Sequence, residues 1–192
     1  MRQVIKIVLQ SLAALIMLPF TLIFFLLALL GGKDEAISSM SQLLSLLPGK
    51  IGAYLRAGFY RFTLKQFHPS VFIGFGTVFS QADIEISEGV YIGPQCNIGL
   101  CSIGKDTLIG SGVHIMSGKK QHNFDNPDVP IRDQGGHFEK ITIGENCWLG
   151  NCALLMASVG DRCVVAAGAV VAQEFDGNVL IAGNPGQQLK TL

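Results

Sequence analysis

Residues 92–110 read IGPQCNIGLCSIGKDTLIG, and the spacing of the isoleucines in this stretch decides the fold. An isoleucine followed by a small residue, usually glycine, recurs at Ile92, Ile98, Ile103 and Ile109, six residues apart except for one step of five. A short, fixed period is the signature of a repeat architecture, and it outweighs local secondary-structure propensity.

The same repeat extends in both directions from this stretch. One tract begins at Val71 and runs to Ile115, and a second runs from Ile143 to Val171. Small residues stand four places after the aliphatic ones, namely Cys96, Ser102, Cys147, Ala153, Cys163 and Ala169. We interpret these small residues as inward-facing ones at the points where the interior of the fold narrows.

The repeat predicts an all-β core made of a parallel β-helix with three short strands per coil. Each period makes one flat face and one corner, and each coil pairs with the next as parallel strands about 4.8 Å apart. Glycine suits the corners because it adopts a positive φ without steric cost. No helical period appears after Val71, which argues against a conventional sheet covered by helices.

The composition excludes one class of function and points to a second region. The chain has 192 residues, with 14 Lys and Arg against 14 Asp and Glu, so its formal charge is zero and no nucleic-acid partner is expected. Only 15% of the residues are charged and 49% are hydrophobic. This excess of apolar residues lies mainly before the repeat.

Residues 1–32 form a predicted membrane segment. No charge occurs between Ile7 and Leu30, which meets the length of about 20 residues that crossing a bilayer requires. A cleaved signal peptide is the alternative, since Arg2 and Lys6 precede the run, but such apolar regions are usually about 7–15 residues long. Pro19 lies near the middle and leaves open a segment that re-enters rather than spans.

Residues 33–70 predict two amphipathic helices at a membrane interface. In the second helix an apolar stripe of Ile51, Leu55, Phe59 and Phe62 opposes the basic residues Lys50, Arg61 and Lys65. The first helix has an apolar stripe composed of Ile37, Met40, Leu43, Leu44 and Leu47. The alternative is that both helices pack on the domain of residues 71–192.

A polar excursion interrupts the repeat at residues 116–140, MSGKKQHNFDNPDVPIRDQGGHFEK. Loops of this length are usually functional or disordered. A solenoid with a filled core has no internal pocket, so an active site would be built from this excursion and a neighbouring subunit.

These features together resemble the left-handed parallel β-helix acyltransferases with hexapeptide repeats. The resemblance covers about Val71 to Lys190 and rests on the hexads, HNFDNPDVPIRDQ at 122–134, ITIGENCWLG at 141–150, AAGAVV at 166–171 and IAGNP at 181–185. The N-terminal apolar run and LLPGKIGAYLRAGFYR at 46–61 resemble a membrane-associated branch that O-acetylates bacterial surface polysaccharides.

The resemblance implies an acetyl-CoA-dependent O-acetyltransferase with His122 as general base. His122 would take the proton from an acceptor hydroxyl, a role that suits the near-neutral pKa typical of imidazole. His137 is the alternative base, whereas His114 alternates with core aliphatics as an outward strand residue and His68 precedes the coils. Asn151 would supply a backbone amide to the thioester oxygen.

The resemblance also implies the residues that bind the acyl donor and the acceptor. The implied donor-binding residues are Trp148, Asn151, Ala166, Ala167, Gly168, Asn184 and Lys190. The implied acceptor-binding residues are Asn97, Asp125 and Asp128, of which the two carboxylates can equally be solvated loop residues. Relatives often have serine at the position of Asn151, so a side-chain contribution is open there.

The resemblance further implies a homotrimer with its sites between subunits and a sugar hydroxyl, on a lipid-linked precursor, as acceptor. We expect the protein at the bacterial inner membrane, in contact with membrane lipid, with its catalytic domain on the cytoplasmic side. No metal is expected, because the cysteines lack zinc-site spacing and unpaired thiols fit a reducing compartment.

Three alternative functions remain open. They are an acetyltransferase for another small acceptor, such as an amino sugar, an amino acid or an antibiotic; a carbonic anhydrase-like zinc enzyme; and a non-catalytic scaffold.

Overall fold

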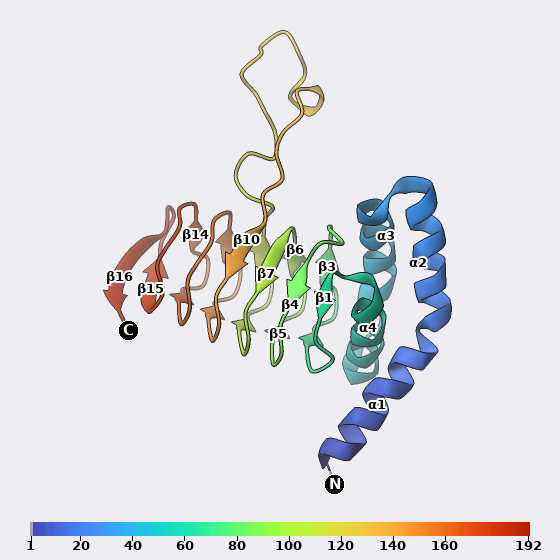
Figure 1. The fold of residues 1–192 in the computed structure, drawn as a ribbon. Helices are drawn as coiled ribbons and strands as arrows, with labels where there is room; N and C mark the ends of the chain where they lie inside the picture. Colours follow the sequence, from blue (N-terminus) through green and yellow to red (C-terminus); the bar gives the residue numbers. More distant parts are fainter. Residues whose placement is uncertain (1) are drawn as a thin grey trace.

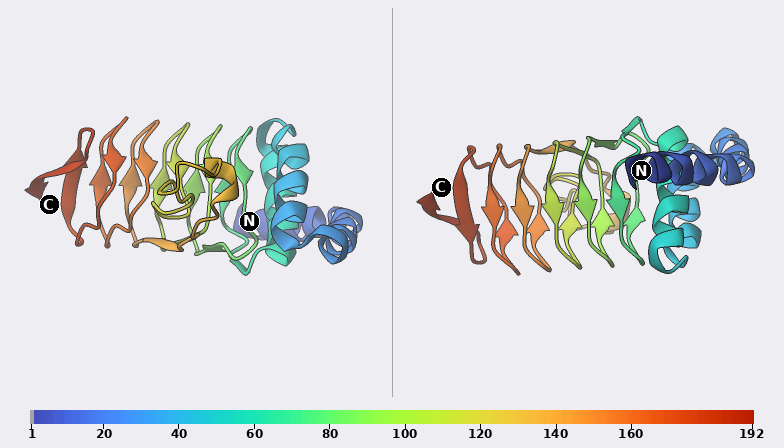
Figure 2. Two further views of the ribbon diagram at one scale, coloured as in Figure 1. Left: turned by 90° about the horizontal axis from the view of Figure 1, so that it is seen from above. Right: turned by 90° about the horizontal axis from the view of Figure 1, so that it is seen from below.

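The chain folds into four helices followed by a β-solenoid, with the helices stacked against one end of the solenoid (Figure 1). The computed structural model describes residues 2–192. The helices are α1 (Arg2–Ile16), α2 (Leu18–Gly31), α3 (Lys33–Ser45) and α4 (Gly49–Thr63). We call these four helices the helical cap. The C-terminus lies at the opposite end of the solenoid (Figure 2).

Three sheets form the faces of the solenoid. Sheet A consists of β1 (Gln66–Phe67), β4 (Glu85–Ile86), β7 (Cys101–Ile103) and β10 (Ile141–Ile143). Sheet B consists of β2 (Phe72–Ile73), β5 (Tyr91–Ile92), β8 (Leu108–Ile109), β11 (Trp148–Leu149), β13 (Val164–Val165), β15 (Val179–Ala182) and β16 (Gln187–Thr191). Sheet C consists of β3 (Val78–Phe79), β6 (Asn97–Ile98), β9 (His114–Ile115), β12 (Leu154–Leu155) and β14 (Val170–Val171).

Neighbouring coils pair in parallel throughout the solenoid, apart from the final strand β16, which folds back antiparallel onto β15. Bridges from Ile143 to Val159 and from Val159 to Phe175 continue sheet A into the last coils. The prediction of a parallel β-solenoid is therefore confirmed, with about six coils stacked along one axis (Figure 2). The first strand, β1, lies before the predicted start of the domain at residue 71.

The repeating aliphatic residues fill the interior as the period predicts. Ile73, Ile92, Ile98 and Ile109 are all fully buried. Cys96, Cys147 and Cys163 are the small inward residues that the spacing indicated, and each thiol contacts a backbone carbonyl oxygen of the following coil.

The prediction for Ser102 is wrong. After the step of five residues the inward position falls on Cys101, which is fully buried. Ser102 faces outward from β7 and donates a hydrogen bond to Glu85 at 3.1 Å. A shift of one residue in a strand moves a side chain to the other face, and the short step produces such a shift here.

The physical reason for the glycine after each aliphatic also differs from the prediction. Gly93 and Gly144 are not among the residues with positive φ. A Cβ on Gly144 would lie 2.4 Å from the Asp161 nitrogen of the next coil, which is closer than real contacts allow. Glycine is thus required for close approach between coils, while left-handed backbone occurs two residues later, as at Asn146 with φ 52°.

The helical cap packs on the first coil through α3 and α4, which confirms the alternative that these helices pack on the following domain. Tyr60 of α4 donates to Ser41 Oγ of α3 at 2.8 Å, and that same oxygen accepts the Phe79 amide of β3. Of the predicted apolar stripe of α4, Phe59 is fully buried, whereas Ile51 and Phe62 are exposed.

Arg56 joins the cap to the solenoid from a fully buried position. Its guanidinium donates to the Leu44 and Leu47 carbonyls at the end of α3 and to the Ile73 carbonyl of β2. The sequence analysis did not single out Arg56, and its role in binding these carbonyl groups was not predicted.

The predicted membrane segment is a bent pair of helices. Within residues 2–192, no single helix is both long and apolar enough to cross a bilayer, but Val4–Ile16 and Leu18–Gly31, bent by 47°, satisfy length and composition together. Much of their apolar surface is exposed, with Leu29 at 83% and Leu30 at 88%. Ala13 and Ala14 are buried where α1 packs closely on Gly58 of α4.

Candidate active site

The three faces of the solenoid differ in their outward side chains. Sheet A is polar, with Gln66, Glu85, Ser102 and Thr142 pointing outward from its strands. Sheet B carries an apolar column in register, which we call the sheet B stripe, composed of Phe72, Tyr91, Leu108, Trp148, Val164 and Leu180. Sheet C presents Asn97 beside His114.

Trp148 lies at the middle of the sheet B stripe and is 53% exposed. The chain turns from β11 into the corner between sheets B and C at Gly150 and Asn151. In the next coil the same corner is formed by Ala166, Ala167 and Gly168. We call these residues, 148–151 and 166–168, the donor corner.

The donor corner exposes a backbone donor. The amides of Gly150 and Cys152 donate to Val165 and Ser111 carbonyls, but the Asn151 amide has no acceptor within the described part of the chain. Asn151 Oδ1 accepts the Ser111 amide at 3.0 Å, so the side chain is held against the preceding coil. The corner thus offers the Asn151 N–H, rather than the side-chain oxygen, to a ligand.

The donor corner also has room for an extended ligand. Ala167 and Gly168 are exposed, and a Cβ on Gly168 would meet no atom within 4 Å. Small residues of this kind let a ligand approach the backbone closely. These observations fit the thioester and pantetheine arm of an acyl-CoA lying along the corner.

The predicted C-terminal residues lie further along the solenoid. Asn184 follows β15 one coil beyond the donor corner, directly after Gly183, whose carbonyl oxygen accepts the Val170 amide. Lys190 lies on β16, opposite Leu180, and is exposed. The tail therefore folds back along sheet B.

The excursion leaves the solenoid after β9 and returns to it at β10. It projects far from the solenoid (Figure 1). Its stems pair through the Asn123 amide to Gly135 and the His137 amide to Lys120, and Gln134 bonds to Asn126 within the tip. His122 is exposed on the outgoing stem.

A shallow recess lies at the foot of the excursion. Its volume is about 130 Å³, and its lining residues are Ser80, Asn97, Gly99, His114, Ile115, Met116, Ser117 and Gln121. Asn97, a predicted acceptor residue, thus lies near Gln121, the neighbour of His122. Asp125 and Asp128 are exposed toward the tip and make no ion pair or hydrogen bond with His122 within the described residues.

A single chain does not bring the two halves of the predicted site into contact. The donor corner lies between sheets B and C, whereas the excursion leaves the coil between sheets C and A. None of the donor-corner residues lines the recess with Asn97. His137 lies on the returning stem, and His114 is an outward strand residue as predicted.

Comparisons with known proteins agree with this architecture. Residues 140–173 match the family model described as the hexapeptide repeat of succinyl-transferase. A maltose O-acetyltransferase from Clostridium difficile 630 matches with a TM-score of 0.73 and 16% identity, over 83% of this chain and 86% of that one. The solenoid has the fold of the hexapeptide-repeat acetyltransferases.

Two further relatives carry this fold or its sequence pattern. VCA0836 of Vibrio cholerae O1 biovar eltor, a hexapeptide-repeat acetyltransferase solved in complex with acetyl coenzyme A, matches with a TM-score of 0.62 and 20% identity, over 82% and 88% of the two chains. WbbJ of Escherichia coli (strain K12), provisionally named a lipopolysaccharide biosynthesis O-acetyl transferase, is 31% identical over 124 residues, 61% of this chain and 62% of WbbJ.

These matches show the hexapeptide-repeat fold and a sequence similarity to hexapeptide-repeat acetyltransferases. The chain spans 44 to 62% of the length of the first three curated relatives that it matches. The family model lies within the repeat, at residues 140–173.

A zinc enzyme on the same fold is not favoured. No group of three or more His, Cys, Asp or Glu side chains with metal-binding geometry occurs in residues 2–192. Burial raises the pKa of the Cys147 thiol to about 11, so this thiol is protonated at neutral pH.

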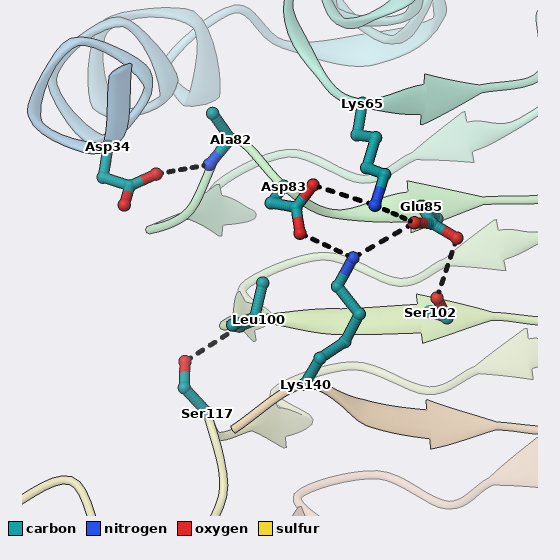
Figure 3. A network of polar contacts seen from close by, with 9 residues as sticks. All are labelled: Asp34, Lys65, Ala82, Asp83, Glu85, Leu100, Ser102, Ser117 and Lys140. Carbon is teal, nitrogen blue, oxygen red and sulfur yellow. Dashed lines mark hydrogen bonds and ion pairs between the residues drawn. The ribbon is translucent and has the colours of Figure 1, made fainter. Parts of the chain in front are cut away.

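Sequence reasoning missed a charged cluster that fixes the foot of the excursion (Figure 3). Lys140, the last residue of the excursion, contacts Asp83 at 2.8 Å and Glu85 at 3.1 Å on sheet A. Lys65 contacts the same two carboxylates at 3.2 and 2.9 Å. Lys140 is the main cause of the lowered pKa of Asp83, and Lys65 is the main cause for Glu85.

The other stem is also fixed. The Leu100 amide donates to Ser117 Oγ at 2.9 Å (Figure 3). The excursion is therefore held at both ends, whereas the hydrogen bonds of its tip, among the described residues, stay within the excursion. The charged residues themselves were visible in the sequence, but their pairing depends on the coil register.

Proposed function

We propose that the protein is an acetyl-CoA-dependent O-acetyltransferase that acts on a sugar hydroxyl of a lipid-linked bacterial polysaccharide precursor. The observation that carries this proposal is the donor corner, where the Asn151 amide without an acceptor lies beside exposed Trp148 and a run of small residues. The His-bearing excursion is the second part of the same site.

The chemistry follows from these two groups. Acetyl-CoA supplies the acetyl thioester. His122 takes the proton of the acceptor hydroxyl, whose oxygen forms a bond to the acetyl carbon as the carbon–sulfur bond breaks, and the proton passes to the departing thiolate. Such a base contributes roughly 10²–10⁴ in rate. The Asn151 N–H holds the negative charge that develops on the carbonyl oxygen.

A second copy of the chain completes this site in the proposal. The sheet B stripe includes Tyr91, Leu108 and Trp148, which are 40, 44 and 53% exposed. A continuous apolar stripe on a water-exposed face is typical of an interaction surface. In the proposed homotrimer, the stripe packs against a neighbour whose excursion brings His122 to the donor corner. The left-handed winding of the β-helix, which the resemblance implies, is part of the same proposal.

The helical cap supports a membrane location. The exposed apolar side chains of α1 and α2 give the chain a surface that a bilayer would cover. We propose that this surface holds the protein at the bacterial inner membrane with the solenoid in the cytoplasm, where acetyl-CoA is made. A lipid-linked acceptor would then be held on the same membrane.

The test is thiol release from acetyl-CoA by detergent-purified protein, with and without a membrane extract that contains lipid-linked glycans. We expect release that requires the extract and falls by at least about 10²-fold in His122→Ala. His137→Ala is the matched control within the same excursion, and we expect it to retain most of the activity.

Other results would assign the chain differently. If activity falls by this amount in His137→Ala and not in His122→Ala, His137 is the base. Binding of acetyl-CoA with turnover on amino sugars, amino acids or antibiotics, and none on the extract, would assign another acceptor. Absence of acetyl-CoA binding to a folded trimer would favour a non-catalytic scaffold.

A further inference from the structure

A cavity of about 220 Å³ lies where α1, α4 and the first coil of the solenoid meet. It lies outside the donor corner and the excursion, and of its lining residues only Phe72 belongs to the sheet B stripe. The lining residues are Lys6 and Gln10 of α1, Lys50, Ala53, Tyr54 and Ala57 of α4, and Ser70, Val71 and Phe72 of the first coil. Three separate segments therefore form its wall.

The cavity is positively charged. Lys6 and Lys50 both line it, and no carboxylate does. Neither lysine forms an ion pair within residues 2–192. Lys50 also lies in the first turn of α4, whose N-cap residue Pro48 provides no capping side chain. The positive end of the α4 dipole thus adds to the two ammonium groups.

A second cavity in the helical cap shows that this charge is particular to its place. That cavity, of about 490 Å³, lies between α2, the end of α4 and residues 82–83. Its lysines, Lys33 and Lys65, are balanced by Asp34 and Asp83 in the same lining. Of these two cavities, only the one at Lys6 and Lys50 combines two cations with a lining that contains no acidic residue.

The surroundings of the charged cavity are apolar on the α1 side. Val4, Ile5, Ile7 and Val8 flank Lys6 in sequence and are 54 to 64% exposed. A ligand that joins a phosphate to acyl or polyprenyl chains matches this pairing of charge and apolar surface, because Lys is a common partner of phosphate and the chains can cover the exposed residues. A free phosphate would leave those side chains in water.

We infer that this cavity binds the phosphate of an anionic membrane lipid and so fixes the helical cap on the bilayer. The inference rests on the membrane location in the proposed function. Lys6 and Lys50 hold the phosphate from two helices, and the half-buried Tyr54 offers a further hydroxyl donor. The site would orient the solenoid relative to the membrane surface.

The test is flotation of the full chain with vesicles after detergent removal. Neutral phosphatidylcholine vesicles are compared with vesicles that contain phosphatidylglycerol, for wild type and for K6Q/K50Q. We expect anionic lipid to raise wild-type binding by about tenfold, and K6Q/K50Q to lose most of that gain while still binding neutral vesicles. The matched control is K33Q/R61Q, which removes the same charge from the cap outside this cavity and should lose at most about threefold.

Each of the other possible outcomes would contradict one element of this proposal. Equal losses in the two double variants would replace the cavity with general surface attraction. Loss of the anionic preference on adding inorganic phosphate at constant ionic strength would assign a free anion to the cavity instead of a lipid. Failure of the wild type to float with either vesicle would overturn the membrane location itself, whereas unaltered binding of K6Q/K50Q would overturn only the lipid site.

Discussion

The solenoid and the excursion satisfy their backbones in different ways. In the solenoid each coil bonds to the coils before and after it, so a residue such as Leu108 is held by its neighbours on both sides. The excursion bonds mainly to itself, with stems joined at Lys120 and His137. The fold and the proposed acceptor chemistry are therefore carried by separate parts of the chain, and each part can be altered while the other is measured.

Removal of the excursion should have the largest effect. The His137 amide donates to the Lys120 carbonyl at 2.7 Å, so residues 121–136 can be replaced by an Asn-Gly turn. We expect acetyl transfer to fall by roughly 10³-fold or more, because His122 and the tip are lost. The midpoint of thermal unfolding should change little, since the hydrogen bonds of residues 121–136 within the described chain all stay inside the excursion. Thiol release and circular dichroism measure the two results.

Two results would contradict this separation between a solenoid that carries the fold and an excursion that carries the proposed chemistry. A truncated protein that keeps half of its activity would place the acceptor site elsewhere on the solenoid. A truncated protein that unfolds many degrees lower would mean that the excursion is part of the folding unit.

A single added methyl group should destabilise the solenoid. In Gly144→Ala the new Cβ would meet the Asp161 backbone of the next coil, which has no free side-chain rotation to give way. Overpacking of this kind costs about 1–3 kcal/mol in the free energy of unfolding. Ala166→Gly is the control at the equivalent corner position, and chemical denaturation should give less than about 1 kcal/mol for it. Equal costs for the two variants would contradict the close-approach explanation.

Asn151→Ala should reduce activity much less than loss of the excursion. The proposed oxyanion donor is the backbone amide, which alanine retains, while the side chain bonds only to Ser111. Loss of one such hydrogen bond is worth about 1 kcal/mol, so we expect kcat to fall by at most about tenfold. Steady-state kinetics on acetyl-CoA measure this change. A loss comparable to that in His122→Ala would mean that the side chain itself contacts the thioester.

The solenoid could be predicted from the sequence because the identity of one residue in each period marks its buried position. Each buried isoleucine is locally visible, and only the step of five residues misled us about Ser102 and Cys101. Sequence could not reveal why the Gly144 type of glycine is needed, since that depends on coil-to-coil distance. Arg56 was missed for a similar reason, because its carbonyl partners belong to two other elements.

The candidate site was predicted in its parts but not in its assembly. Motif matches led to His122 and Trp148, and both are exposed. Their separation across two corners of the coil depends on where the excursion leaves the solenoid, and no local pattern encodes it. The recess residue Gln121 was adjacent to a predicted one and was overlooked because a glutamine has no distinctive motif.

The smallest effect is expected where the two regions meet, at Lys140. Its partners Asp83 and Glu85 have pKa values lowered from 3.8 and 4.5, so their contribution to stability is present above those values and is lost as the pH falls through the lower folded values. The Lys140 side chain is 25% exposed and that of Asp83 is 55% exposed, so water still screens the pair, and Lys140→Met should cost less than about 1 kcal/mol at neutral pH. Unfolding measured against pH should bring wild type and variant together once the pH is below the lowered folded pKa values, and about 1 M salt should do the same at neutral pH. A difference that persists in acid or high salt would mean that Lys140 acts through packing of its alkyl chain, and the foot of the excursion would then belong structurally to the solenoid.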